Sequence, residues 1–132
     1  MKGIIFMVTV ESIFNKLSYS AEVLGKSTET SGSHLRVTIE RNNNDKTLVF
    51  EFHANMYSDG DLETYIECLF TDRAAYLFSQ NARDFAESFG YEVDSDKALS
   101  IYKDCKENST KLSKFFTERE LEVLERWVAD QI

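Results

Sequence analysis

The chain has 132 residues, 42% of them hydrophobic and 13% aromatic, and its formal net charge is −8 at pH 7. This length fits one domain over residues 1–132, and the apolar content suffices for a packed core, which excludes wholesale disorder. The acidic balance argues against binding nucleic acid through a basic surface, and no apolar run approaches the roughly 20 residues of a membrane span.

The first elements are predicted to be a short helix and a strand. Thr9 can cap a helix at this point. Apolar residues recur at helical spacing behind it: Val10, Ile13, Phe14 and Leu17. Tyr19, Ala21 and Val23 then alternate with polar residues, which predicts a short strand that ends at Gly25. Residues 26–33 are polar and are expected to form a surface loop.

Two runs with a period of two predict a β-hairpin between His34 and His53. The apolar residues that share one face of it are Leu35, Val37, Ile39, Leu48, Phe50 and Phe52. A four-residue loop at 42–45, rich in asparagine, would pair Arg41 with Lys46 and Ile39 with Leu48. The same register sets Arg36 opposite Glu51, and His34 opposite His53.

The second half of the chain is predicted to be helical. Ser58 or Asp59 can cap a first helix. Its apolar stripe is Leu62, Tyr65, Ile66, Leu69 and Phe70. Asn81 can cap a short helix that Gly90 ends in a left-handed conformation. The inward residues of this helix are Ala82, Phe85, Ala86 and Phe89. Tyr76 and Phe78, between the two helices, are candidates for exposed anchors.

A long helix should start at Asp94 or Ser95. Its inward residues are Ala98, Ile101, Tyr102, Cys105, Leu112 and Phe115. The last helix opens with a capping box, Thr117 with Glu120. Its apolar face is Leu121, Leu124, Trp127 and Val128. The fold class that follows is α+β: a small antiparallel sheet, made of the hairpin and one further strand, followed by a helical C-terminal half.

No motif in the sequence identifies a reaction, so we expect a protein that is not an enzyme and carries no cofactor. Cys68 and Cys105 are far apart and are expected to be buried free thiols. An alternative is a metal-dependent enzyme or sensor that uses His34 and His53, the only two histidines. A zinc site needs further ligands, which the spacing does not supply, so no metal residue is assigned.

The charge is uneven, because from residue 45 to residue 72 the only base is Lys46. Like charges four residues apart on a helix repel each other, so local stability does not explain Glu63 and Glu67. Such a row of carboxylates can resemble phosphates to a basic groove. The candidate partner-binding residues are Asp59, Asp61, Glu63, Glu67 and Asp72.

The chain resembles a family of small uncharacterised proteins encoded by bacteriophages and prophages. The hairpin carries the resemblance together with residues 65–69, Asp72, Asn81, Phe85, 89–91, Asp94, Ser95, Lys97, Ala98, Tyr102 and Cys105. Residues 89–98 are the most specific part. The chain departs from the family at Asp96, where a basic residue is commoner, and at residues 54–56, where a Gly-containing loop is usual. The family has no established activity, so the resemblance implies an origin.

The leading expectation is a phage-encoded accessory protein in the cytoplasm of a bacterial host. It would inhibit a host defence system, as anti-CRISPR proteins do, by covering a basic, nucleic-acid-binding surface of a host protein with its acidic residues. Besides the histidine alternative, a third hypothesis is a regulatory or structural phage protein that acts through self-association.

Overall fold

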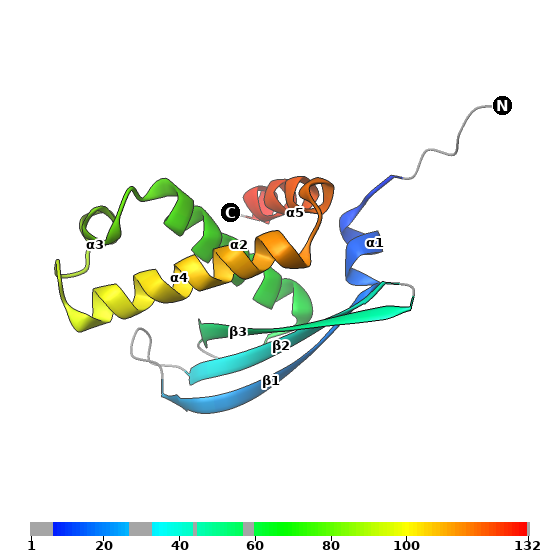
Figure 1. Cartoon of the computed structure of the whole chain (residues 1–132), viewed down its shortest axis with the longest axis horizontal. Helices are drawn as coiled ribbons and strands as arrows, with labels where there is room; N and C mark the ends of the chain where they lie inside the picture. Colours follow the sequence, from blue (N-terminus) through cyan, green and yellow to red (C-terminus); the bar gives the residue numbers. More distant parts are fainter. Residues whose placement is uncertain (1–6, 27–32, 44, 57–59, 132) are drawn as a thin grey trace.

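The computed structural model describes residues 7–26, 33–43, 45–56 and 60–131. A three-stranded antiparallel sheet, in the order β1-β2-β3, lies under a layer of helices (Figure 1). The elements are α1 (Val10–Phe14), β1 (Leu17–Lys26), β2 (Ser33–Asn43), β3 (Lys46–Met56), α2 (Leu62–Phe78), α3 (Ala82–Phe89), α4 (Asp96–Phe115) and α5 (Glu118–Gln131). The predicted α+β class is confirmed.

The short first helix and the first strand are both present, with different lengths from those predicted. Thr9 caps α1 in a capping box, because the Ser12 N–H donates to Thr9 Oγ1 (3.0 Å) and the Thr9 N–H donates to Ser12 Oγ (2.8 Å). The helix ends at Phe14, and Leu17 begins β1 instead of extending the helix. The strand has 10 residues and bulges between Val23 and Gly25.

The predicted hairpin is present, but its predicted register is wrong by two residues. Ile39 pairs with Phe50 and Arg41 pairs with Leu48, so Asn42 and Asn43 continue the ladder instead of forming the loop. Hairpins favour two-residue connections, which is the physical reason for the tighter turn. A shift of two leaves every side chain on its predicted face, because side chains alternate along a strand.

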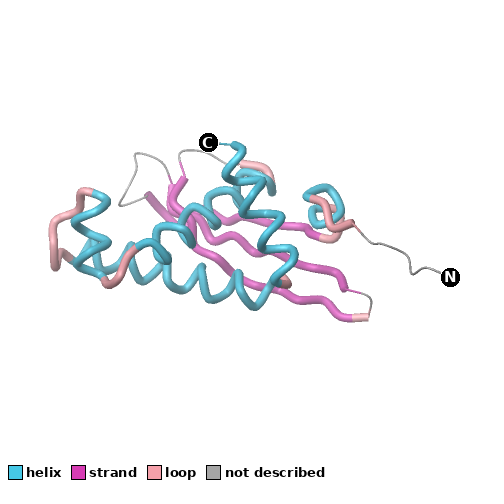
Figure 2. The backbone as a smooth tube through the Cα atoms, turned by 90° about the horizontal axis from the view of Figure 1, so that it is seen from above, coloured by secondary structure: helices cyan, strands magenta, loops and turns pink. Residues whose placement is uncertain are grey.

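The core lies between the sheet and the helices. Figure 2 shows α2 and α4 crossing one face of the sheet, with the strands beneath them. The buried residues of this core include, on the sheet, Leu35, Val37, Ile39, Phe52 and Ala54, and on the helices, Tyr65, Ile66, Leu69, Phe70, Leu112, Phe115, Leu121, Leu124 and Val128. The predicted inward stripes of α2 and α5 are confirmed, although Leu62 and Trp127 are only partly buried.

Short-range signals define the helix starts. Asn81 caps α3, accepting from the Asp84 N–H (2.9 Å), and Gly90 ends that helix at φ 77°, as predicted. Ser95 caps α4, accepting from the Ala98 N–H at 3.2 Å. The predicted cap of α2 is wrong: Asp61 caps it, accepting from the Thr64 N–H (2.8 Å), while Ser58 and Asp59 lie outside the described residues.

A second, smaller cluster joins α3 to α4. Phe85, Ile101 and Cys105 are buried there, and Tyr76 and Tyr102 pack against them with their ring centroids 5.6 Å apart. Tyr76 is therefore part of this cluster, whereas Phe78 at the end of α2 is 73% exposed. Phe89 was predicted to face inward and is 46% exposed instead, because it lies on the last turn of a short helix, at the edge of the cluster.

Candidate functional site

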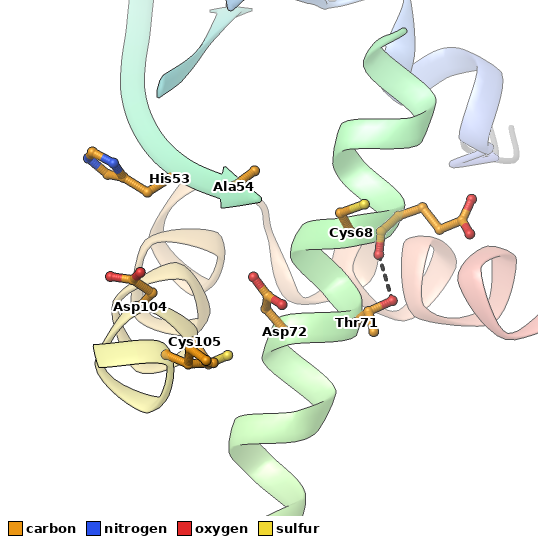
Figure 3. A pocket seen from close by; sticks show the side chains of 9 residues that line it. His53, Ala54, Cys68, Thr71, Asp72, Asp104 and Cys105 are labelled. Carbon is orange, nitrogen blue, oxygen red and sulfur yellow. Dashed lines mark hydrogen bonds between the residues drawn. The ribbon is translucent and has the colours of Figure 1, made fainter. Parts of the chain in front are cut away.

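A pocket of about 170 Å³ lies where the end of β3 meets α2 and α4. Figure 3 shows its labelled side chains: Asp72 extends from α2 towards α4, and Asp104 lies on α4 on the side of His53. The lining residues are His53, Ala54, Glu67, Cys68, Thr71, Asp72, Ile101, Asp104 and Cys105. No sequence motif spans these residues, because they come from three elements that are far apart in the chain.

Asn108 of α4 connects two residues that line the pocket. It is 2% exposed, and its Nδ2 donates to Asp72 Oδ2 (3.1 Å) and to the backbone oxygen of His53 (3.3 Å). One amide thus ties α2, β3 and α4 at a single point. Asp72, predicted as a partner-contact residue, is half-buried here and takes part in this internal contact. The role of Asn108 was missed because the pattern of α4 was assigned from its apolar residues alone.

The two histidines are neighbours, although the predicted direct pairing is wrong. His34 pairs with Asn55, and His53 pairs with Arg36, so the two rings meet diagonally with His53 Nδ1 3.4 Å from His34 Nε2. Burial raises the pKa of the nearby Asp104, while the charges of His53 and His34 act in the opposite direction. The two imidazole nitrogens thus lie within hydrogen-bonding distance of each other.

Two further features of the pocket are the state of its thiols and the arrangement of groups that bind metals. Burial raises the pKa of Cys68, and the charges of Asp72 and Glu67 raise it further, so its thiol stays protonated and is a poor nucleophile. Cys105 is buried as predicted, whereas Cys68 is only half-buried. Among the residues that the structure describes, no group of three or more His, Cys, Asp or Glu side chains is arranged to hold a metal ion.

The predicted acidic residues do not form one uniform surface. Asp59 lies outside the described residues. Asp61 caps α2, and hydrogen bonds from the backbone and hydroxyl of Thr64 hold its pKa below the ordinary value. Glu63 is exposed in the first turn of α2, where its negative charge interacts favourably with the helix dipole. Glu67, half-exposed, stands one turn further on, at the rim of the pocket.

None of the ion pairs between described residues involves Asp61, Glu63 or Glu67. The nearest base along the helix, Arg73, pairs with Glu125 of α5. The basic residues gather elsewhere: Lys103, Lys106, Lys111 and Lys114 line a shallow groove on α4. The start of α2 therefore keeps its negative charge without an internal counter-charge in the described part of the chain.

The sequence analysis missed a buried ion pair. Arg41 continues the inward face of β2 and donates to both carboxylate oxygens of Glu120, each at 2.6 Å. It also donates to the backbone oxygen of Phe115 (3.1 Å). Glu120 was assigned only its capping role, which is confirmed, since Thr117 N donates to Glu120 Oε1 at 2.9 Å. Extending the period-two pattern of β2 by one step would have placed Arg41 inward.

No described helix combines the length and the apolar character that crossing a membrane requires. Comparison with protein families, curated proteins and solved structures finds no match to this chain. Function is therefore inferred from the residues and their geometry.

Proposed function

We propose that this protein is a phage-encoded accessory protein that inhibits a bacterial defence system, in the manner of an anti-CRISPR protein. It binds a basic, nucleic-acid-binding surface of a host protein through the start of α2. Asp61, Glu63 and Glu67 are the described contact residues, and Asp59 belongs to the same proposal on sequence alone. Asp72 contributes to the field of this surface from its half-buried position beside Asn108.

One observation carries the proposal: the carboxylates at the start of α2 have no internal ion pair among the described residues, although the chain has 15 bases. Some exposed carboxylates elsewhere, such as Glu22, Glu51 and Glu87, lie beside an arginine. Others, such as Glu118 and Glu122 of α5, are in none of the ion pairs between described residues, which is why they serve as the comparison below. A solvent-exposed set of unpaired charges attracts an oppositely charged partner and steers its approach. The attraction weakens as salt rises.

The test compares two charge reversals of the same spacing. Glu63→Lys with Glu67→Lys changes α2, and Glu118→Lys with Glu122→Lys changes α5. Each pair combines a first-turn glutamate with one four residues on. Both variants should keep the wild-type circular dichroism spectrum. Only the α2 variant should lose activity.

Activity is measured as plaque formation by a targeted phage in cells that carry an active CRISPR–Cas system. Wild type and the α5 variant should restore plaques, and the α2 variant should not. Binding to the purified effector complex should fall steeply as salt rises. The assay is repeated with cells that carry different CRISPR–Cas types. Protection by the α2 variant equal to that of wild type, or no protection by wild type against any of these types, would contradict the proposal.

The histidine pair supports a second candidate function, a sensor of protons or of a metal ion. The specific observation is the 3.4 Å separation of His53 Nδ1 and His34 Nε2 beside Asp104. Zinc titrated into the protein should release heat in wild type and none after His34→Gln with His53→Gln. Equal heat from the two proteins, or none from either, would remove metal sensing from consideration.

A further inference from the structure

The two edges of the sheet are treated differently by the rest of the molecule. On β3, the backbone oxygens of Glu51 and His53 point away from β2 and accept from side chains of α4. Lys111 Nζ donates to Glu51 at 2.6 Å, and Asn108 Nδ2 donates to His53 at 3.3 Å. This edge is therefore covered by its own chain, one of the ways in which proteins protect an edge strand.

The β1 edge has no such cover among the described residues. The Asn42 N–H donates to the Lys16 backbone oxygen (3.0 Å). This bond identifies which residues of β1 point their backbone groups towards β2. Because hydrogen-bonded pairs alternate with non-bonded pairs, the backbone groups of Leu17, Tyr19, Ala21 and Val23 point to the outer side. No hydrogen bond between described residues outside the strand ladders reaches these backbone groups.

The side chains of this edge are suited to pairing. Tyr19 and Val23 pair with the buried Ile39 and Leu35, so they lie on the apolar side of the sheet, yet they are 37% and 59% exposed. The chain has no proline to block the edge. The one charge between Leu17 and Gly25 is Glu22, which lies 3.6 Å from Arg36 on the other face. The bulge lies after Val23, so residues 17–23 remain regular.

We infer that β1 pairs antiparallel with β1 of a second copy of this chain, about a two-fold axis at Ala21. This register sets Tyr19 of each copy opposite Val23 of the other, so the two exposed apolar side chains cover each other. It joins the outward backbone groups and sets Glu22 opposite Ser20. An axis at Glu22 would bring two carboxylates together, which is unfavourable. The result is one six-stranded sheet with both helical layers on the same face.

The β1 edge adjoins the acidic start of α2, because the Tyr19 hydroxyl donates to the Gly60 backbone oxygen at 2.7 Å and the Tyr19 ring lies 5.3 Å from that of Tyr65. The inference is nevertheless tested by a separate measurement, the mass of the assembly. The test uses sedimentation equilibrium of the full chain, whose single-copy mass is 15.2 kDa. Wild type should show twice that mass. Ala21→Lys and Ala21→Glu each place two like charges at the axis and should show the single-copy mass. An equimolar mixture of the two variants should return to the two-copy mass.

Val49→Lys is the control, because Val49 is an exposed residue of β3, the strand whose edge α4 covers, and it should keep the two-copy mass. Circular dichroism checks that all variants fold. In wild type, hydrogen exchange should slow at the amides of Tyr19, Ala21 and Val23 as concentration rises. A single-copy mass for wild type, an unchanged mass for both Ala21 variants, or a mixture that stays at the single-copy mass would overturn the inference.

Discussion

Two sets of carboxylates in this molecule have opposite surroundings. Glu120 is 6% exposed, receives two hydrogen bonds from Arg41 and a third from the Thr117 N–H, and closes the core where α5 begins. Glu63, which is exposed, and Glu67, which is half-exposed, lie on α2 and form none of the ion pairs between described residues. The two sets therefore differ in what they do: Glu120 holds the fold together, and the α2 pair is available to another molecule.

This difference between the two sets of carboxylates follows from where the fold places its limited number of basic residues. It has 23 acids and 15 bases, so many carboxylates stay without a cation whatever the fold. The fold uses Arg41 for the core and Arg73 for the contact of α2 with α5, and four lysines of α4 line a groove on that helix. None of these cations reaches the start of α2. The local excess of negative charge is thus a result of tertiary placement as well as of composition.

The largest expected effect is on the buried pair. Glu120→Ala leaves the Arg41 guanidinium buried without its partner, and it should lower the free energy of unfolding by about 3–5 kcal/mol. Urea unfolding followed by circular dichroism measures this change. Replacing both partners, as Arg41→Met with Glu120→Leu, should recover most of the loss, because two apolar side chains leave no buried charge. A loss for Glu120→Ala within the range of surface substitutions, about 0.5 kcal/mol, would show that the pair is not buried in solution.

The same pair should make stability depend on pH. Burial alone would raise the pKa of Glu120, but the hydrogen bonds from Arg41 and Thr117 and the charge of Arg41 hold that pKa below its ordinary value. Between the lowered native pKa and the unfolded value of about 4.3, the unfolded chain binds more protons than the native one. This contribution to stability is therefore complete above that window and is lost as pH falls through it.

The measurement is a set of urea unfolding curves from neutral pH down to about pH 3, for wild type and for the Arg41→Met, Glu120→Leu double variant. The difference between the two should shrink or change sign at low pH. Asp104, whose pKa is raised by burial, contributes the opposite slope, but it is present in both proteins and cancels in the difference. Parallel curves would show that Glu120 has the same pKa in the native and unfolded states.

The parts that the sequence predicted are those set by residues close in the chain. Caps such as Asn81 and Ser95, the stop at Gly90 and the box at Thr117 need only neighbours three or four residues away. The faces of the hairpin were also predicted, because period two is a local property. Its register was not, since two registers that differ by two residues bury the same face, and the choice between them depends on the turn.

The sites were harder, because each depends on contacts between distant residues. Asn108 reaches His53 across 55 positions, and Arg41 reaches Glu120 across 79. Nothing in the neighbourhood of either polar residue indicates its partner. The sequence predicted an acidic stretch correctly as a matter of charge. The sequence did not show that Asp61 caps a helix whereas Glu67 does not, because this distinction depends on the residue at which α2 begins.

The smallest expected change in stability distinguishes a carboxylate that has an ion-pair partner, Glu125, from one that has none among the described residues, Glu67. Glu67→Gln removes a repulsion from Glu63 one turn away, so it should raise the free energy of unfolding by about 0.2–0.5 kcal/mol. The matched substitution Glu125→Gln removes the partner of Arg73 and should lower it by about 0.2–1 kcal/mol. Urea unfolding at low salt resolves the two signs, and added salt should shrink both changes. A loss of stability in Glu67→Gln would mean that this carboxylate supports the fold, and it would leave Glu63 as the one exposed α2 glutamate available to a partner.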